Sequence, residues 1–233
     1  MKLFNLGKTT IALAGKYCLI PGRPCPVSIN LHQNEQTSVE AATLVVSERG
    51  GEFWKLATED PERLVHFEME SGTYAFDPNR IFTPQGCLKT LIDENSCYDD
   101  QAYLELLSFG QNLLEAFMPK DNRVVIGMHN NKGEDYSIES YQEDVFLQSD
   151  CSLIQINPEI SPHDFFFTTD PEIFNLLAQL DLNVVLQDNQ RVTDDGSLSV
   201  YCAKVQVPYV NIEAKKDHLI QQVAMMNLLY NIL

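Results

Sequence analysis

The segment VVIGMHNN, residues 124–131, joins the features of a buried strand to a strongly polar end. Its first residues are β-branched or apolar, which favours an extended conformation in the interior of a sheet. The segment then ends in His129, Asn130 and Asn131. This polar end is expected either to form a simple turn or to belong to a site. The second possibility arises because open α/β sheets bind their ligands beyond the carboxyl ends of the strands.

Strand-like and helix-like segments alternate on both sides of this stretch. We expect strands at 42–48, 124–129, 183–187 and 209–214, a hairpin over 65–76, and helices over 99–118, 169–180 and 217–233. This alternation indicates an α/β fold with a mostly parallel sheet flanked by helices. We find no internal repeat and no long linker, so residues 1–233 are expected to form a single domain.

The composition excludes some classes of partner. Hydrophobic residues make up 44% and charged residues 21% of the 233 residues, as is usual for a globular protein. The 16 basic and 33 acidic residues give a net charge of −17, which argues against binding to nucleic acid. No apolar run approaches the roughly 18–20 residues that span a bilayer, and no membrane partner is expected. The first twenty residues lack a clear leader peptide and predict a cytoplasmic protein.

The six cysteines are scattered, without the close spacing of a zinc knuckle. In a chain of this size they are more typical of packed thiols than of a disulfide framework. A bond between Cys87 and Cys97 in an oxidising compartment stays open at this stage.

Three of the expected strands end in polar residues, at Ser47-Glu48, His129-Asn130 and Glu213. Two carboxylates and an imidazole at one rim are the ingredients of a zinc hydrolase, in which zinc keeps one coordination position open for water. Glu213 is the strongest single indication of a site, because a carboxylate between Ile212 and Ala214 in a buried strand must be paired, metal-bound or functional.

The order of four motifs resembles the superfamily of zinc-dependent carboxypeptidases and N-acetylmuramoyl-L-alanine amidases. The motifs, spread over roughly residues 42–230, are a strand followed by Gly50-Gly51-Glu52, DPNR at 77–80, the His-Asn-Asn end at 129–131, and YVNIEA at 209–214. The resemblance implies a phosphorylase/hydrolase-like, zinc exopeptidase-like α/β fold. It also implies hydrolysis of an amide or peptide bond in a small substrate with a free carboxylate.

The resemblance assigns roles to individual residues. His129 would be a zinc ligand, and Glu213 the general base that deprotonates a zinc-bound water. Asn79 and Arg80 would hold the substrate carboxylate, since a guanidinium suits bidentate contacts, and Arg80 would help to stabilise the developing oxyanion. Two further substrate contacts are predicted, at Asn130 and Tyr201.

The chain departs from the superfamily at the first zinc histidine, where Ser47 follows the apolar run. Glu52 is the preferred carboxylate ligand and Glu48 the second choice. Either His66 or His163 would then complete the site, or the protein has lost its metal.

Two other classes of function stay open. A metal-free and inactive relative would use the carboxylate-holding pocket to bind a peptide end or a partner protein. A purely structural or interaction protein would have no pocket chemistry, with DPNR an ordinary turn and His129 a hydrogen-bonded turn residue.

Overall fold

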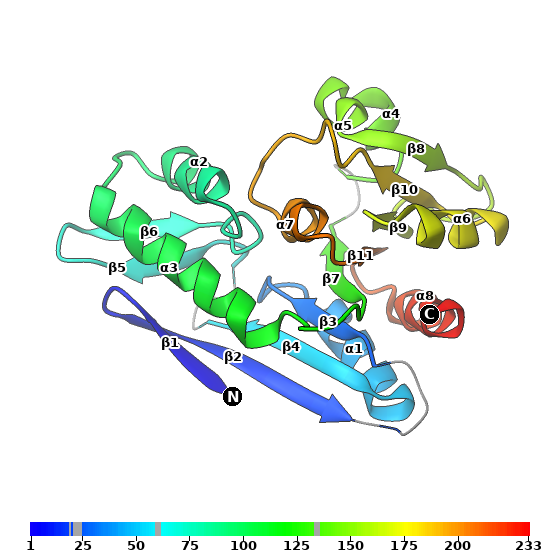
Figure 1. The fold of residues 1–233 in the computed structure, drawn as a ribbon, viewed down its shortest axis with the longest axis horizontal. Coiled ribbons are helices and arrows are strands. Elements are labelled where there is room, and N and C mark those ends of the chain that lie inside the picture. The colour runs from blue at the N-terminus through cyan, green and yellow to red at the C-terminus, as the bar shows by residue number, and fades with distance from the viewer. Residues whose placement is uncertain (19, 21–24, 59–61, 133–135) are drawn as a thin grey trace.

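The computed structural model describes residues 1–18, 20, 25–58, 62–132 and 136–233. Within them, one sheet of nine strands runs through the molecule in the order β1-β2-β4-β3-β7-β11-β9-β10-β8 (Figure 1). Its strands are β1 (Lys2–Leu6), β2 (Thr9–Cys18), β3 (Val27–Asn30), β4 (Gly51–Ala57), β7 (Val125–Asn131), β8 (Cys151–Gln155), β9 (Phe165–Thr168), β10 (Val184–Gln187) and β11 (Tyr209–Lys215). A separate two-stranded sheet pairs β5 (Val65–Glu68) with β6 (Thr73–Phe76).

The large sheet is mixed. Four neighbouring pairs are parallel, namely β3–β4, β3–β7, β7–β11 and β9–β10. The other four are antiparallel, namely β1–β2, β2–β4, β9–β11 and β8–β10. The α/β class is therefore confirmed, but the parallel pairing is confined to the centre and to one pair near the edge.

Helices cover both faces of the sheet. They are α1 (Gln36–Arg49), α2 (Pro84–Glu94), α3 (Asp100–Phe117), α4 (Ser140–Glu143), α5 (Val145–Ser149), α6 (Pro171–Gln179), α7 (Leu198–Val205) and α8 (Leu219–Ile232). Buried residues of α1, α6 and α8 pack together against one face. The other face is covered by α3, α7 and the small sheet at one end and by α4 and α5 at the other.

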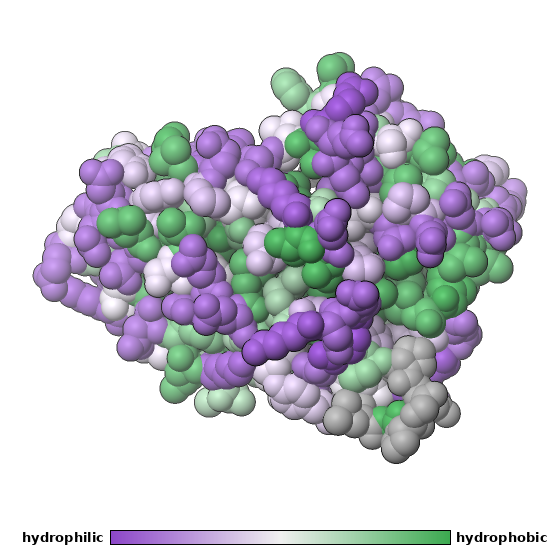
Figure 2. Space-filling view, in the orientation of Figure 1, coloured by the Kyte–Doolittle hydropathy of each residue, from purple (hydrophilic) through white to green (hydrophobic). Residues whose placement is uncertain are grey.

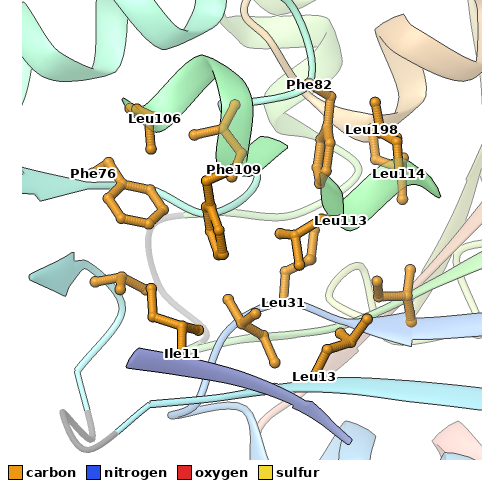
Figure 3. Packing of buried hydrophobic residues seen from close by; sticks show 14 of the residues in the cluster. Ile11, Leu13, Leu31, Phe76, Phe82, Leu106, Phe109, Leu113, Leu114 and Leu198 are labelled. Atoms are coloured by element: carbon orange, nitrogen blue, oxygen red, sulfur yellow. The ribbon is translucent and has the colours of Figure 1, made fainter. Parts of the chain in front are cut away.

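The packing of α3 shows how its sequence selects its position (Figure 3). Leu106, Phe109 and Leu113 recur at helical spacing, and all three are fully buried in one cluster with Ile11 and Leu13 of β2. The helix starts where Asp99 accepts a hydrogen bond from the backbone nitrogen of Ala102, and its last residue is Phe117, two before Pro119. The predicted helix over 99–118 is thus confirmed.

The predicted strand at 42–48 is wrong, because this segment is the second half of α1. Its apolar residues follow a helical pattern that begins earlier, with Ala41, Ala42, Val45 and Val46 all buried against the sheet and α8. The β-branched residues favour a strand locally, but burial of this stripe overrides that modest preference.

The remaining predicted elements are confirmed. The hairpin is β5–β6, the strands are β7, β10 and β11, and the helices are α6 and α8. The disulfide left open between Cys87 and Cys97 is absent, since both are free thiols and Cys87 is buried. In the parts of the chain that the structure describes, no helix is long and apolar enough to cross a bilayer.

Hydrophilic side chains predominate on the face drawn in Figure 2, and hydrophobic ones gather mainly around α6 and α8.

The parallel strands at the centre set the place of the site. Because β3, β4, β7 and β11 all run in the same direction, their carboxyl ends meet at one edge of the sheet. Whatever follows these four strands is brought together there, although it is far apart in the sequence.

Candidate metal centre

Three side chains at this edge form a buried cluster of metal-ligand type, which consists of His32, Glu35 and His129. His32 follows β3, Glu35 is the residue before α1, and His129 lies near the end of β7. Their exposed fractions are 0%, 4% and 5%. Two imidazoles and a carboxylate so deeply buried need either protons shared among them or a cation.

The spacing of the two imidazole nitrogens fits a tetrahedral ion. The Nδ1 atoms of His32 and His129 are 3.3 Å apart, and bonds of about 2.0–2.1 Å in a tetrahedron place neighbouring ligand atoms about 3.3 Å apart. The two oxygens of Glu35 lie on different sides of this pair, Oε1 at 3.0 Å from His32 Nδ1 and Oε2 at 3.1 Å from His129 Nδ1. Either oxygen could serve as the third protein ligand of a divalent ion.

The orientation of His32 is set by Asp77. The Nε2 atom of His32 lies 2.9 Å from Oδ1 of Asp77, so Nε2 carries a hydrogen, and Nδ1 faces the cluster with its lone pair once it is deprotonated. Arg63 donates to the other oxygen of Asp77 at 2.9 and 3.1 Å. Asp77 thus serves as the second layer of the centre.

Glu35 is held from behind by Asn30. The Nδ2 atom of Asn30 donates to the carbonyl of Met128 at 3.1 Å and lies 3.4 Å from Oε2 of Glu35. The first turn of α1 is fixed in the same way, because Ser38 accepts from Asn30 and donates to the carbonyl of Glu35. These contacts tie β3, β7 and α1 together at the cluster.

The electrostatics of the metal-free cluster follow from its burial. Burial disfavours a charged His32, but Glu35 and Asp77 outweigh it and raise the pKa of the imidazole to about 9. Burial likewise opposes ionisation of Glu35, yet His32 and His129 lower its pKa to about 2. The cluster therefore holds a proton where an ion would otherwise supply the positive charge.

Glu213 stands beside the cluster. It is the register partner of His129 across the parallel pair β7–β11, and 7% of it is exposed. Burial raises its pKa, and Glu35 raises it further, whereas His129 and the 3.2 Å hydrogen bond from Nδ2 of Asn211 lower it. A carboxylate of raised pKa next to an open metal position is suited to accept a proton.

Glu35 and His129 of the cluster, together with Glu213, line a cavity of about 490 Å³, and the third member, His32, is fully buried beside them. Asn79 and Arg80 line the same cavity from the loop between β6 and α2. Asn79 accepts from the backbone nitrogen of Leu198 at 3.0 Å, which leaves Nδ2 to donate, and Arg80 bonds the carbonyl of Asn79 at 2.8 Å. Asp195 lies 3.5 Å from Nε of Arg80, so most of the guanidinium donors stay available for an anion.

The DPNR segment forms an ordinary turn that also contacts the cluster. Asp77 accepts from the backbone nitrogen of Asn79 at 2.8 Å, which is the local bond of such a turn. The same carboxylate lies 2.9 Å from Nε2 of His32, so the turn connects Asn79 and Arg80 to the cluster.

Asn130 and Tyr201, the two further substrate contacts predicted from the sequence, lie in different surroundings. Asn130 borders the cavity, but its amide is used by Ser38 at 2.7 Å and Gln222 at 2.8 Å. Tyr201 packs into the core beside α3 and borders a separate depression on that side. Asn130 therefore lies at the same cavity as Glu35 and His129, whereas Tyr201 does not.

The two glutamates predicted as ligands lie away from the cluster. Glu48 and Ser47 are on the exposed side of α1. Glu52 starts β4, at the amino ends of the parallel strands, where Arg123 donates to it at 2.7 Å. The wrong ligands follow from the strand wrongly predicted at 42–48. The first ligand was expected after this segment, which is part of α1, and not after the preceding strand β3.

The two histidines considered as replacements are also elsewhere. His66 is exposed on β5, and His163 lies 3.0 Å from the carbonyl of Tyr136. The ligands that the sequence interpretation missed are His32 and Glu35. Their signal was present, as a His-x-x-Glu pattern at 32–35 that follows the short alternating segment VSIN at 27–30.

Comparisons with known proteins give little beyond the fold. No family model and no curated protein matches the chain. Two crystal structures resemble it, each described as a "putative metallopeptidase", from Shewanella baltica OS155 and Shewanella amazonensis SB2B. Each alignment covers 100% of this chain and 86% of the other, with 15% identity and a TM-score of 0.47. These values are too low to transfer a function.

Proposed function

We propose that this chain is a metal-dependent hydrolase of carboxypeptidase or amidase type, which cleaves an amide bond in a small substrate with a free carboxylate. One observation carries the proposal. Glu35 and His129 of the cluster, the carboxylate of Glu213 and the donors of Arg80 all border one cavity, and the fully buried His32 completes the cluster.

Zinc is the ion that suits the donor set, because two imidazole nitrogens at tetrahedral spacing and a carboxylate leave one position open. When bound, it would act as a Lewis acid on a carbonyl and would depress the pKa of a water molecule.

Glu213 would move the protons. Its carboxylate accepts a proton from the attacking water and then delivers that proton to the nitrogen of the leaving group. The raised pKa caused by burial helps both steps, since it brings the carboxylate closer to the pH at which the enzyme would work.

Arg80 and Asn79 would position the substrate. The free N–H groups of Arg80 and Nδ2 of Asn79 can bind the two oxygens of a carboxylate. Fixing the substrate at this end directs its amide carbonyl toward the cluster and restricts the reaction to bonds near a free carboxyl end.

The argument for a metal-free relative depended on Ser47 standing at the first ligand position. Ser47 lies on α1, and the position is filled by His32. This supports a hydrolase over a pure binding module.

The proposal is tested with zinc-loaded protein and N-acylated dipeptides that end either in a free carboxylate or in an amide. We expect cleavage of the free acids only. The Glu213→Gln variant should lose roughly 10²- to 10⁴-fold in kcat while it keeps its zinc. Glu48→Gln, on the exposed side of α1, is the matched control and should keep full activity. Full activity of Glu213→Gln, or equal cleavage of the amidated peptides, would contradict the proposal.

A further inference from the structure

Four residues that line the cavity have a buried amide oxygen with no partner among the described residues, namely Asn34, Asn131, Gln187 and Asn211. Two of the four belong to the strands β10 and β11: Oε1 of Gln187, at the end of β10, and Oδ1 of Asn211. Gln187 is 3% exposed and Asn211 is 9% exposed. A buried acceptor without a donor is unfavourable, and native structures seldom keep one without a reason.

The orientation of the Gln187 amide is fixed by a chain of hydrogen bonds. The carbonyl of Thr169 can only accept, so Nδ2 of Asn189 must donate to it, at 2.8 Å. Oδ1 of Asn189 is then the acceptor for Nε2 of Gln187, at 3.0 Å. Rotation of the Gln187 amide would bring two oxygens together, and Oε1 is therefore left on the other side.

The orientation of the Asn211 amide is set by a single contact, with Glu213. Its Nδ2 donates to the carboxylate of Glu213 at 3.2 Å, and an ionised carboxylate has no hydrogen to offer in return. With Glu213 ionised, Oδ1 of Asn211 is therefore the free acceptor.

The surroundings of these oxygens form one wall of the cavity. Phe167 and Tyr209 border the cavity from β9 and β11, which lie between β10 and the metal cluster in the sheet. Asp150 lies at the same end, because its backbone bonds that of Asp188, and its Oδ1 accepts from the backbone and hydroxyl of Thr193. Acceptors and a negative charge thus predominate there.

We propose that this wall selects substrates whose carboxyl-terminal residue has an N–H-donating side chain, either an amine or an amide. The inference rests on the proposed function, since it takes Arg80 as the anchor of the carboxylate and the cluster as the position of the amide bond. The side chain next to that carboxylate is then left to face Gln187 and Asn211. A donor that reaches these oxygens satisfies them, whereas an apolar or carboxylate side chain leaves them buried without a partner.

The test is direct binding of free amino acids, which are the products that such a reaction would release. L-lysine, L-glutamine, L-methionine and L-glutamate have side chains of similar length and differ in their donors. Titration calorimetry on zinc-loaded and on zinc-free protein should show lysine or glutamine binding roughly 10- to 100-fold more tightly than methionine and glutamate.

Variants locate the effect. Gln187→Met should remove the discrimination between glutamine and methionine, and Gln101→Met, on the surface of α3, is the matched control that should keep it. Asp150→Asn separates the two kinds of donor, because only the binding of lysine should weaken. Equal binding of all four amino acids, no binding of any, or unchanged discrimination in Gln187→Met would overturn the inference.

These outcomes are separable from those of the proposed function. Cleavage of peptides that end in methionine as fast as those that end in lysine or glutamine would leave the hydrolase intact and remove the inference. Selective binding of lysine or glutamine without any cleavage would keep the inference and remove the hydrolase.

Discussion

His32 has two nitrogens with separate tasks, one directed at the cluster and one at Asp77. Removing the second contact should weaken the first, because a neutral amide no longer stabilises the hydrogen on Nε2 or raises the basicity of Nδ1. We expect Asp77→Asn to lower zinc affinity roughly 10- to 100-fold. Competition with a chromophoric chelator measures this affinity.

The matched control for Asp77→Asn is Asp93→Asn, which removes an exposed carboxylate that pairs with Lys89 on α2. It should leave zinc affinity unchanged. An Asp77→Asn protein that binds zinc as tightly as the wild type would show that this second layer does not matter.

Individual residues differ in how well the sequence predicts them. His129, Glu213, Asn79 and Arg80 were predicted from motif order, and the structure brings all four to one cavity. His32 and Glu35 were not, because four residues of strand give little periodicity and the longer apolar run at 42–48 drew the first ligand to the wrong element.

At the scale of elements, α8 supports the end of β7 from below the sheet. Gln222 is fully buried, and it donates to the carbonyl of His129 and accepts from Nδ2 of Asn130, both at 2.8 Å. Gln222→Leu removes the side-chain donor to the buried carbonyl of His129 and leaves Nδ2 of the part-buried Asn130 with the carbonyl of Ala214, at 3.4 Å. The free energy of unfolding should fall by about 1–3 kcal/mol, measured by urea denaturation.

The neighbouring Gln221 is exposed and gives the matched control. Gln221→Leu should change the free energy of unfolding by less than about 0.5 kcal/mol. If the two variants had equal stability, the contact between α8 and β7 would have no structural role.

Elements were predictable where pattern and burial agree. The stripe of α3 and the capping aspartates before α3 and α6 gave both helices directly. In α1, β-branched residues conflict with the helical stripe, and only the neighbouring sheet and α8 decide the conflict. The mixed pairing of the sheet depends on contacts between distant strands, which local pattern does not contain.

At the scale of the whole molecule, the cluster links metal binding to pH. The pKa of His32 is raised from 6.5 to about 9 in the folded, metal-free protein. A raised pKa adds stability that is complete below pH 6.5 and is lost as the pH rises through about 9. Zinc, in contrast, needs a deprotonated imidazole and binds more tightly as the pH rises.

The increase in Tm caused by zinc should therefore grow from pH 6.5 to pH 9. Thermal unfolding of zinc-loaded and chelator-treated protein across this range measures the difference. An increase in Tm that stays constant or shrinks toward alkaline pH would contradict the assignment of His32.

The central claim is that His32, Glu35 and His129 hold the metal, and zinc content tests it most directly. Elemental analysis of folded, zinc-reconstituted protein should find about one zinc per chain in the wild type. We expect this zinc to be lost in His32→Ala and kept in Glu52→Gln, whose carboxylate pairs with Arg123 at the other edge of the sheet. Zinc that is kept in His32→Ala and lost in Glu52→Gln would contradict the account.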